Sequence, residues 1–84
     1  MKICFADEAW EDYLFWSKED KKVLKKINTL IKDISREPYS GLGNPEPLKY
    51  NWSGYYSRRI TIEHRLVYKV VDNTILIAQC RYHY

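Results

Sequence analysis

The chain has 84 residues and a net charge of +3 at pH 7. So short a chain predicts one domain, spanning residues 1–84, with a modest core, and none of its apolar runs approaches the ~20 residues of a membrane-spanning helix. The N-terminus becomes acidic at Asp7, too early for the apolar stretch of a signal peptide, so we expect a cytoplasmic protein. Its two cysteines, Cys4 and Cys80, have no metal-ligand spacing and are expected as buried reduced thiols, and no cofactor is indicated.

The excess positive charge lies in the second half of the chain. Residues 1–42 balance eight Lys and Arg against eight Asp and Glu, whereas residues 43–84 hold six against three. In this second half the basic residues alternate with aromatic ones, which suits a polyanion whose bases can stack. Aromatic residues on strands can equally belong to the core or to cross-strand pairs. Composition alone therefore leaves both interpretations open.

The first twenty residues predict a short strand and a helix. Lys2 to Phe5 is short, apolar and β-prone. Asp7 can cap a helix that runs to about Lys18. We expect one apolar face on this helix, formed by Trp10, Tyr13 and Leu14.

A second helix is predicted to run to about Ser35. The segment 17–20 resembles a capping box, with Asp in place of the usual Glu or Gln. Lysines fill one face of the helix, which is either an ordinary solvated face or a docking surface for a large polyanion. Pro38 ends the helix. The apolar residues recur at helical spacing and form one stripe: Val23, Ile27, Leu30, Ile31 and Ile34.

The remainder predicts a loop followed by four strands. Residues 40–47 are rich in Gly and Pro and should form a loop. Residues 48–52 are expected to be a strand, and residues 55–84 three antiparallel strands, with a hairpin turn at Asp72 and Asn73. The order β-α-α-β-β-β-β predicts an α+β fold: an antiparallel sheet with two N-terminal helices packed on one face.

Alternation along each strand predicts which side chains share a face. If the helices cover the apolar sets, Arg59, Arg65 and His83 point to the uncovered face. The residues expected against the helices are Ile60, Leu66, Tyr68, Val70, Leu76, Ala78, Cys80 and Tyr82.

An uncovered face with arginines, a histidine and a nearby glutamate is a candidate site for phosphodiester chemistry. Cleavage of RNA without a metal needs a base for the 2′-hydroxyl, a cation for the phosphorane and an acid for the leaving 5′-oxygen. Glu46, Arg65 and His83 have the right chemistry for these three roles. Each also has a simpler interpretation, as a loop carboxylate, an edge-protecting arginine and a surface histidine.

Four segments carry a resemblance to a known family: residues 46–49, 57–60, 63–68 and 80–84. They read Glu-Pro-Leu-Lys, Ser-Arg-Arg-Ile, Glu-His-Arg-Leu-Val-Tyr and Cys-Arg-Tyr-His-Tyr. They strongly resemble the YoeB toxins, in the Txe/YoeB branch of the RelE superfamily of bacterial toxin–antitoxin systems. The resemblance covers essentially the whole chain. Trp52 departs from the aliphatic residue expected at its position.

The resemblance implies an mRNA interferase, that is, an endonuclease acting on mRNA in the ribosomal A site and contacting rRNA. It also implies a microbial-ribonuclease-like, RelE-type fold, inhibition by a YefM-like antitoxin and no membrane partner, and it leaves a homodimer open. The roles it implies are Glu46 as general base, Arg65 as phosphorane stabiliser, His83 as general acid, Lys49 and Arg59 at the scissile phosphate, and Tyr84 as a C-terminal residue of the site.

Three other functions fit parts of the sequence. A non-catalytic RNA-binding module would share the basic, aromatic sheet without needing Glu46 or His83. A protein-directed toxin of the same superfamily, such as a gyrase inhibitor, would lack this base–acid pair. An interaction module whose only role is antitoxin pairing would tolerate the loss of single active-site side chains.

Overall fold

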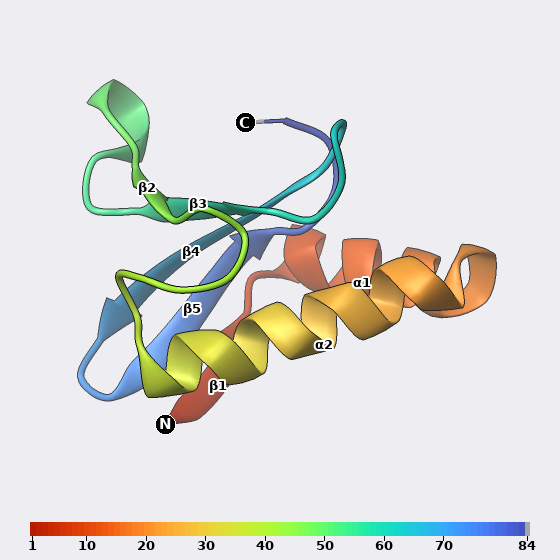
Figure 1. The fold of residues 1–84 in the computed structure, drawn as a ribbon, viewed down its shortest axis with the longest axis horizontal. Coiled ribbons are helices and arrows are strands. Elements are labelled where there is room, and N and C mark those ends of the chain that lie inside the picture. The colour runs from red at the N-terminus through yellow and green to blue at the C-terminus, as the bar shows by residue number, and fades with distance from the viewer. Residues whose placement is uncertain (84) are drawn as a thin grey trace.

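The structure, a computed structural model, describes residues 1–83. Its elements, shown in Figure 1, are β1 (Lys2–Phe5), α1 (Asp7–Glu19), α2 (Lys21–Arg36), β2 (Glu46–Pro47), the 3-10 helix η1 (Tyr50–Trp52), β3 (Tyr56–Arg59), β4 (Arg65–Val71) and β5 (Thr74–Gln79).

The strands form one sheet in the order β1-β5-β4-β3-β2, with both helices on the same face (Figure 1). The predicted α+β class is therefore confirmed. The sheet differs from the prediction at one edge, where β1 runs parallel to β5 and pairs Lys2 with Thr74. The other neighbouring strands are antiparallel. Parallel pairing at this edge is possible because almost the whole chain lies between the two strands and provides the long connection.

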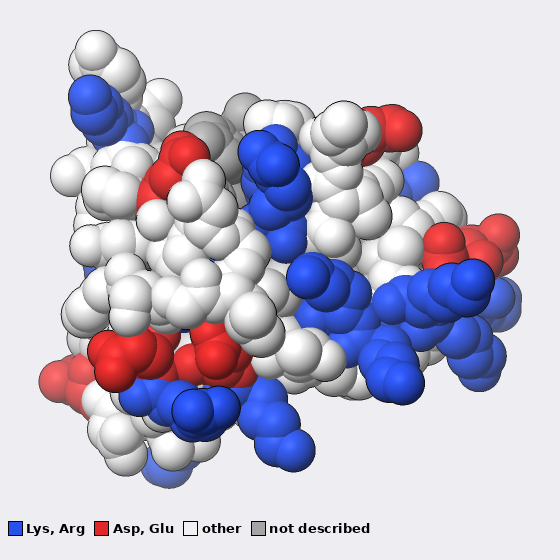
Figure 2. All heavy atoms as spheres, viewed as in Figure 1, with Lys and Arg blue, Asp and Glu red and all other residues white. Residues whose placement is uncertain are grey.

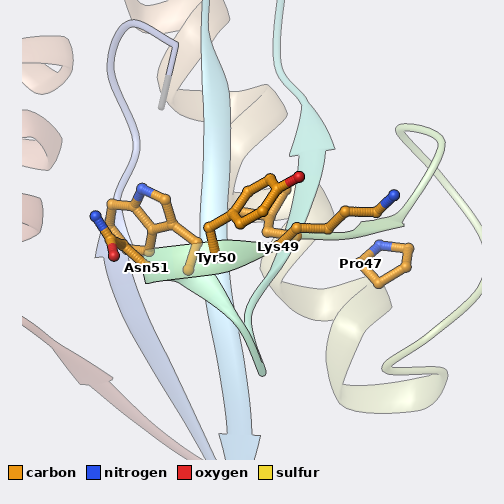
Figure 3. Close-up of a pocket in the computed structure, with 6 residues that line it drawn as sticks. Pro47, Lys49, Tyr50 and Asn51 are labelled. Atoms are coloured by element: carbon orange, nitrogen blue, oxygen red, sulfur yellow. The ribbon is translucent and has the colours of Figure 1, made fainter.

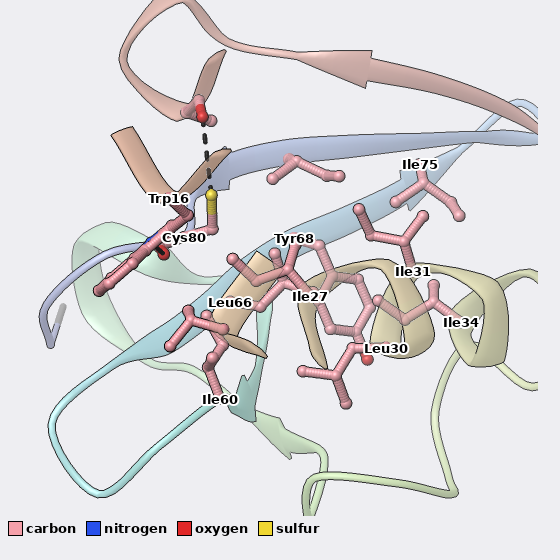
Figure 4. Close-up of a cluster of buried hydrophobic side chains, with 13 residues drawn as sticks. Trp16, Ile27, Leu30, Ile31, Ile34, Ile60, Leu66, Tyr68, Ile75 and Cys80 are labelled. Atoms are coloured by element: carbon pink, nitrogen blue, oxygen red, sulfur yellow. Dashed lines mark hydrogen bonds between the residues drawn. The ribbon is translucent and has the colours of Figure 1, made fainter. Parts of the chain in front are cut away.

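Helix α2 follows the prediction closely. It buries the entire predicted stripe against the sheet, because charged residues on the opposite side leave only one apolar face. Figure 4 shows Ile27, Leu30 and Ile34 of this stripe gathered around Tyr68 and Ile75 of the sheet. This contact is the centre of the core.

Helix α1 presents a different face from the one expected. Ala9 and Trp16 are buried, whereas Trp10 and Leu14 are 47% and 45% exposed. The Trp10 ring instead stacks on Tyr13 at the surface, with centroids 5.6 Å apart. Aromatic and other apolar residues lie on several sides of this helix, so its sequence does not define a single apolar stripe.

Both helix starts also differ from the predictions. Helix α1 begins at Asp7 itself, after Ala6, which offers no capping side chain. Helix α2 is capped by Asp20, whose carboxylate accepts the N–H groups of Lys22 and Val23 at 3.1 and 3.2 Å. Ser17 lies within α1 and does not cap α2.

The face assignment in the last strand is corrected by the structure. Ile75 and Ile77 are buried against the helices, whereas Leu76 and Ala78 are only half-buried. The strand ends at Gln79, and a bulge beside it lets the next residue, Cys80, return to the core.

Three further predictions need correction. Residues 48–52 form no strand, because η1 folds part of them back, and the neighbouring strand β2 is only two residues long. Cys80 is buried as expected, but Cys4 is exposed. Tyr82, expected in the core, is 59% exposed.

None of the helices in the described part of the chain is both long and apolar enough to cross a membrane.

Candidate active site

A buried arginine holds the loop that leads into the site. Arg58 is fully buried on the helix side of β3 and donates five hydrogen bonds. Its guanidinium has five N–H donors, so all of them are satisfied. Asp33 forms the ion pair, at 2.6 Å from Nη1, and Tyr68 accepts from Nε at 3.1 Å. The other acceptors are the backbone carbonyl oxygens of Glu37, Ser40 and Leu42, so the loop is wrapped around this side chain.

The loop then crosses β3 at Gly43. The N–H of Arg59 donates to the Gly43 carbonyl oxygen at 2.7 Å. Gly43 has a φ of +78°, and a Cβ here would lie 3.0 to 3.1 Å from Leu30, from Arg58 and from a backbone oxygen. Only glycine fits this crossing without strain. The crossing fixes where the next residues, including Glu46, rejoin the sheet.

Three predicted site residues meet on the open face of the sheet. Glu46 in β2 lies opposite Ser57 in β3, and Arg59 lies opposite Arg65. Ser57 and Arg59 are two residues apart on one strand, so all four side chains share a face. They line one small hollow together with Gly43 and Asn44.

Asn44 is a polar neighbour of the glutamate that the sequence did not identify. Its side-chain amide donates to Oε1 of Glu46 at 3.3 Å, while Glu46 itself is exposed. The only signal in the sequence is the residue type at this turn. Asn tolerates the left-handed backbone that Asn44 adopts, at a φ of +53°. The amide orients a carboxylate that remains accessible to a substrate.

Arg65 is oriented by the turn that precedes β4. Its Nη1 donates to the carbonyl oxygens of Thr61, Ile62 and His64, at 2.7, 3.2 and 3.1 Å. The turn is closed by the Thr61 hydroxyl oxygen, which accepts the N–H groups of Glu63 and His64 at 3.2 Å each. Arg65 is half-buried, so its position is set while its edge still reaches the hollow.

Helix α1 holds the segment after β5. The Cys80 N–H donates to Asp12 Oδ2 at 3.1 Å, and Trp16 Nε1 donates to the Cys80 carbonyl oxygen at 2.8 Å. The Arg81 guanidinium lies 3.5 Å from the centre of the Phe15 ring. Residues 80 and 81 are therefore fixed by three side chains of one helix.

Tyr82 ties the chain end to the neighbourhood of Arg65. The Arg65 N–H donates to the Tyr82 carbonyl oxygen at 3.0 Å, and the Tyr82 N–H donates to Nδ1 of His64 at 2.7 Å. Tyr82 makes these bonds with a φ of +63°. His83 follows it directly and is exposed, and Tyr84 lies outside the described residues. The backbone thus brings His83 next to the strand that carries Arg65.

Lys49 lies beside this hollow, not in it. It lines a larger cleft with the other residues of segment 47–52 (Figure 3). Pro47 lines the same cleft and directly follows Glu46. Lys49 therefore approaches the site from the η1 side.

Burial shifts the pKa of two groups that support the chain end. It raises the pKa of the Cys80 thiol to about 12, so this thiol stays protonated at neutral pH and donates weakly to the Ala9 carbonyl oxygen at 3.6 Å. Burial also raises the pKa of the Asp12 carboxyl, an effect that the Cys80 N–H partly offsets. Both groups therefore serve to hold backbone.

The hollow combines an accessible carboxylate with two guanidinium groups. Such a group of side chains can accept a proton while it stabilises negative charge on a bound oxyanion. Among residues 1–83 no group of three or more His, Cys, Asp and Glu side chains could hold a metal ion.

Comparison with known proteins identifies the family. Residues 5–84 match the model of the YoeB-like toxin of bacterial type II toxin–antitoxin systems. The chain is 61% identical to toxin YoeB of Escherichia coli and 58% identical to toxin YoeB of Synechocystis, over all 84 residues. It covers 100% and 98% of those two proteins. The chain belongs to the YoeB toxin family.

Solved structures agree with this membership. The YoeB/ParE toxin from Agrobacterium tumefaciens superposes with a TM-score of 0.98 at 48% identity, covering 100% of both chains. A YoeB–YefM complex from Staphylococcus aureus superposes with a TM-score of 0.94 at 54% identity, covering 100% of this chain and 98% of that one. YafQ from E. coli, at 21% identity and a TM-score of 0.74, shares the fold. The chain is thus a YoeB-family toxin of a toxin–antitoxin system.

Proposed function

We propose that this YoeB-family toxin is an endoribonuclease that cleaves mRNA in the ribosomal A site and so inhibits translation. The observation that carries the proposal is the hollow in which Glu46, Arg59 and Arg65 meet, with the backbone before His83 bonded to Arg65. Since ribosomes are cytoplasmic, this activity would take place in the cytoplasm.

The first chemical step needs a base and an anion-stabilising group. Ionised Glu46 takes the proton of the 2′-hydroxyl, and the 2′-oxygen attacks the neighbouring phosphorus. Arg65 stabilises the negative charge of the phosphorane, and its three carbonyl contacts through Nη1 hold it in position for this role. Arg59 and Lys49 hold the scissile phosphate.

The second step needs an acid for the leaving group. Protonated His83 gives its proton to the 5′-oxygen as the P–O bond breaks. The products are a 2′,3′-cyclic phosphate, which water can open to a 3′-phosphate, and a 5′-hydroxyl end. The resemblance gives Tyr84 a place at the same end of the site.

The ribosome supplies what so small a site lacks. It would position the message and so contribute the orientation part of the rate enhancement. Figure 2 shows basic side chains gathered along α2, where Lys21, Lys22, Lys25, Lys26 and Lys32 are exposed. We propose that this face meets rRNA phosphates, with an affinity that falls as salt rises.

The relatives suggest the protein partners. YoeB of S. aureus has been solved in complex with YefM and also as a dimer. We therefore propose that a YefM-like antitoxin inhibits this chain, and that a homodimer is open to it.

The proposal is tested by mapping 5′ ends of mRNA on translating ribosomes. We expect Glu46→Ala and His83→Ala each to keep the fold and to lose ~10²–10⁴-fold in cleavage rate, as is typical of acid–base catalysis. Arg65→Ala should also keep the fold and lose most of the cleavage, because the charge of the phosphorane is no longer stabilised. Arg65→Lys should rescue only partly, because a point charge replaces a planar fork.

Glu19→Ala, which removes an exposed carboxylate at the end of α1, is the matched control and should cleave normally. Wild-type rates in Glu46→Ala or His83→Ala would show that the residue does not have the assigned role. Ribosome binding without any cleavage by the wild-type protein would favour the non-catalytic RNA-binding module instead.

A further inference from the structure

The segment around η1 projects from the sheet and exposes an aromatic side chain. In Figure 1 it rises at the upper left, beyond the ends of β2 and β3. Tyr50 within it is 91% exposed, more than the other large hydrophobic side chains of residues 1–83 that reach the surface. Within the described chain its ring pairs with no other ring, whereas Trp52 packs edge-on against Tyr55 at 5.2 Å. One aromatic face is therefore left to solvent.

This projection, residues 47–52, is held in place by backbone hydrogen bonds. The Leu48 N–H bonds to the Tyr55 carbonyl oxygen at 2.9 Å, and the Trp52 N–H to the Lys49 carbonyl oxygen at 3.1 Å. Tyr50 is held at a φ of +57°, in a left-handed region that residues other than glycine rarely adopt. Strain of this kind clusters at binding and catalytic sites.

The projection is continuous with the candidate active site. In Figure 3 the Lys49 side chain extends toward Pro47, the residue next to Glu46. Three residues separate Glu46 from Tyr50, so the Cα atoms of these two residues lie at most about 14 Å apart. At the 3.4 Å rise of a stacked strand this is about four nucleotides. A base against Tyr50 would thus belong to the same strand as the cleaved bond.

Together, these features fit one class of ligand. Segment 47–52 encloses a cleft of about 450 Å³ with an aromatic ring and an ammonium group on its wall. A nucleotide matches both, because its base stacks on aromatic rings and its phosphate attracts the cation.

We propose that Tyr50 stacks on a base of the message within about four nucleotides of the cleaved bond, while the neighbouring Lys49 contacts the scissile phosphate of the same strand. The inference rests on the proposed function and adds a substrate-binding position to it. Every base has a π-face, so this contact tightens binding of messages of any sequence.

The test uses ribosomes programmed with a message that carries a 2′-deoxy nucleotide at the cleavage position and 2-aminopurine at one nearby position. Since this message cannot be cleaved, binding is read separately from catalysis. We expect wild-type toxin to quench the fluorescence at one of these positions. Tyr50→Leu should abolish the quenching and weaken binding by about 5- to 150-fold, the range of one stacking contact, and Tyr50→Phe should retain both.

Tyr39→Leu is the matched control, because Tyr39 is a 56% exposed tyrosine outside the projection. On cleavable message, Tyr50→Leu should raise KM and leave kcat nearly unchanged, with an unaltered melting temperature. If the wild type cleaves while Tyr50→Leu shows normal KM and normal quenching, the inference is overturned and the proposed function stands.

If the wild type does not cleave, the proposed function fails, and quenching on the 2′-deoxy message still decides the stacking contact. Equal weakening by Tyr50→Leu on ribosomes without message would assign the contact to rRNA and overturn the inference. A changed melting temperature in Tyr50→Leu would leave Tyr50→Phe and the wild-type quenching as the deciding measurements.

Discussion

His64 is a positioning residue for the chain end. Its Nδ1 accepts the Tyr82 N–H at 2.7 Å, and its ring packs edge-on against Trp16 at 4.8 Å. The adjacent Arg65 uses the His64 carbonyl oxygen as one of its three acceptors. A single residue thus contacts both the segment that leads to the proposed acid and the proposed phosphorane stabiliser.

We predict that His64→Ala lowers cleavage by up to ~10²-fold, the loss that a misplacement of about 1 Å can cause. The reason is that Tyr82 loses the acceptor that fixes the residue before His83. The measurement is single-turnover cleavage on ribosomes, together with amide hydrogen exchange at Tyr82.

His64→Asn separates the hydrogen bond from packing of the ring, because a side-chain amide oxygen can accept the same N–H. It should recover most of the cleavage and most of the exchange protection. If exchange at Tyr82 is equally slow in His64→Ala and the wild type, His64 does not hold the chain end.

At the scale of elements, the accuracy of prediction followed the contrast between polar and apolar residues. Helix α2 alternates lysines with aliphatic residues, and its whole buried stripe was predicted. Helix α1 carries aromatic residues on several sides, and for that reason the sequence does not predict which of its faces is buried. In β5 the run Ile75–Ala78 is apolar throughout, so alternation carried no signal there.

A bulge explains why part of the β5 prediction still held. Val67 lies opposite Gln79, and the next residue, Tyr68, lies opposite Ile77. Ala78 is therefore the extra residue, and it reverses the parity of everything after it. Cys80 reached the core as predicted, although the strand before it faces the other way from the prediction. A bulge depends on tertiary pairing and leaves little trace in one sequence.

The connection between α2 and β2 makes a pH-dependent contribution to the stability of the fold. Asp33 accepts the Leu42 N–H at 2.9 Å and pairs with Arg58, and these contacts lower the pKa of its carboxyl. A lowered pKa in the folded state means that the ionised form is favoured by folding. Its contribution to stability is present above the unfolded pKa of about 3.9 and is lost as the pH falls through the folded value.

We predict that Asp33→Asn lowers the free energy of unfolding at pH 7 and that the difference from the wild type shrinks below about pH 4. It leaves the guanidinium of Arg58 without its anionic partner. Urea denaturation at a series of pH values measures both effects. Asp20→Asn is a suitable control, since Asn caps a helix about as well as Asp. A difference that stays constant from pH 7 to pH 3 would contradict the assigned role.

At the scale of the whole molecule, the sequence names the residues of the candidate site, and the structure adds how three of them are arranged. The pairing of β2, β3 and β4 placed Glu46, Arg59 and Arg65 in one hollow, and strand register was the information missing from the sequence. The buried role of Arg58 was missed, although it shares parity with Ile60 on the helix side. A buried guanidinium could not be predicted here, because its hydrogen-bond acceptors belong to a loop whose path the sequence does not show.

Two exposed groups of basic side chains carry the proposed contacts. One group lies on the α2 face, and the other at the site with its projection, where Lys49 and Arg59 are exposed. The start of α2, at the right of Figure 1, lies far from β2 and β3. This separation allows the two surfaces to be tested independently.

We predict that the antitoxin inhibits with an acidic segment laid across or near Arg59 and Arg65. Opposite charges speed association, and salt screens them over a Debye length of about 10 Å at 0.1 M. The association rate, measured by stopped flow against a YefM-like antitoxin, should therefore fall as salt rises. Arg59→Gln should slow association and flatten its salt dependence. Lys22→Gln, which removes one exposed charge at the start of α2, should change association little. An association rate independent of salt, or equal effects of both substitutions, would mean that inhibition does not depend on the charge of the site.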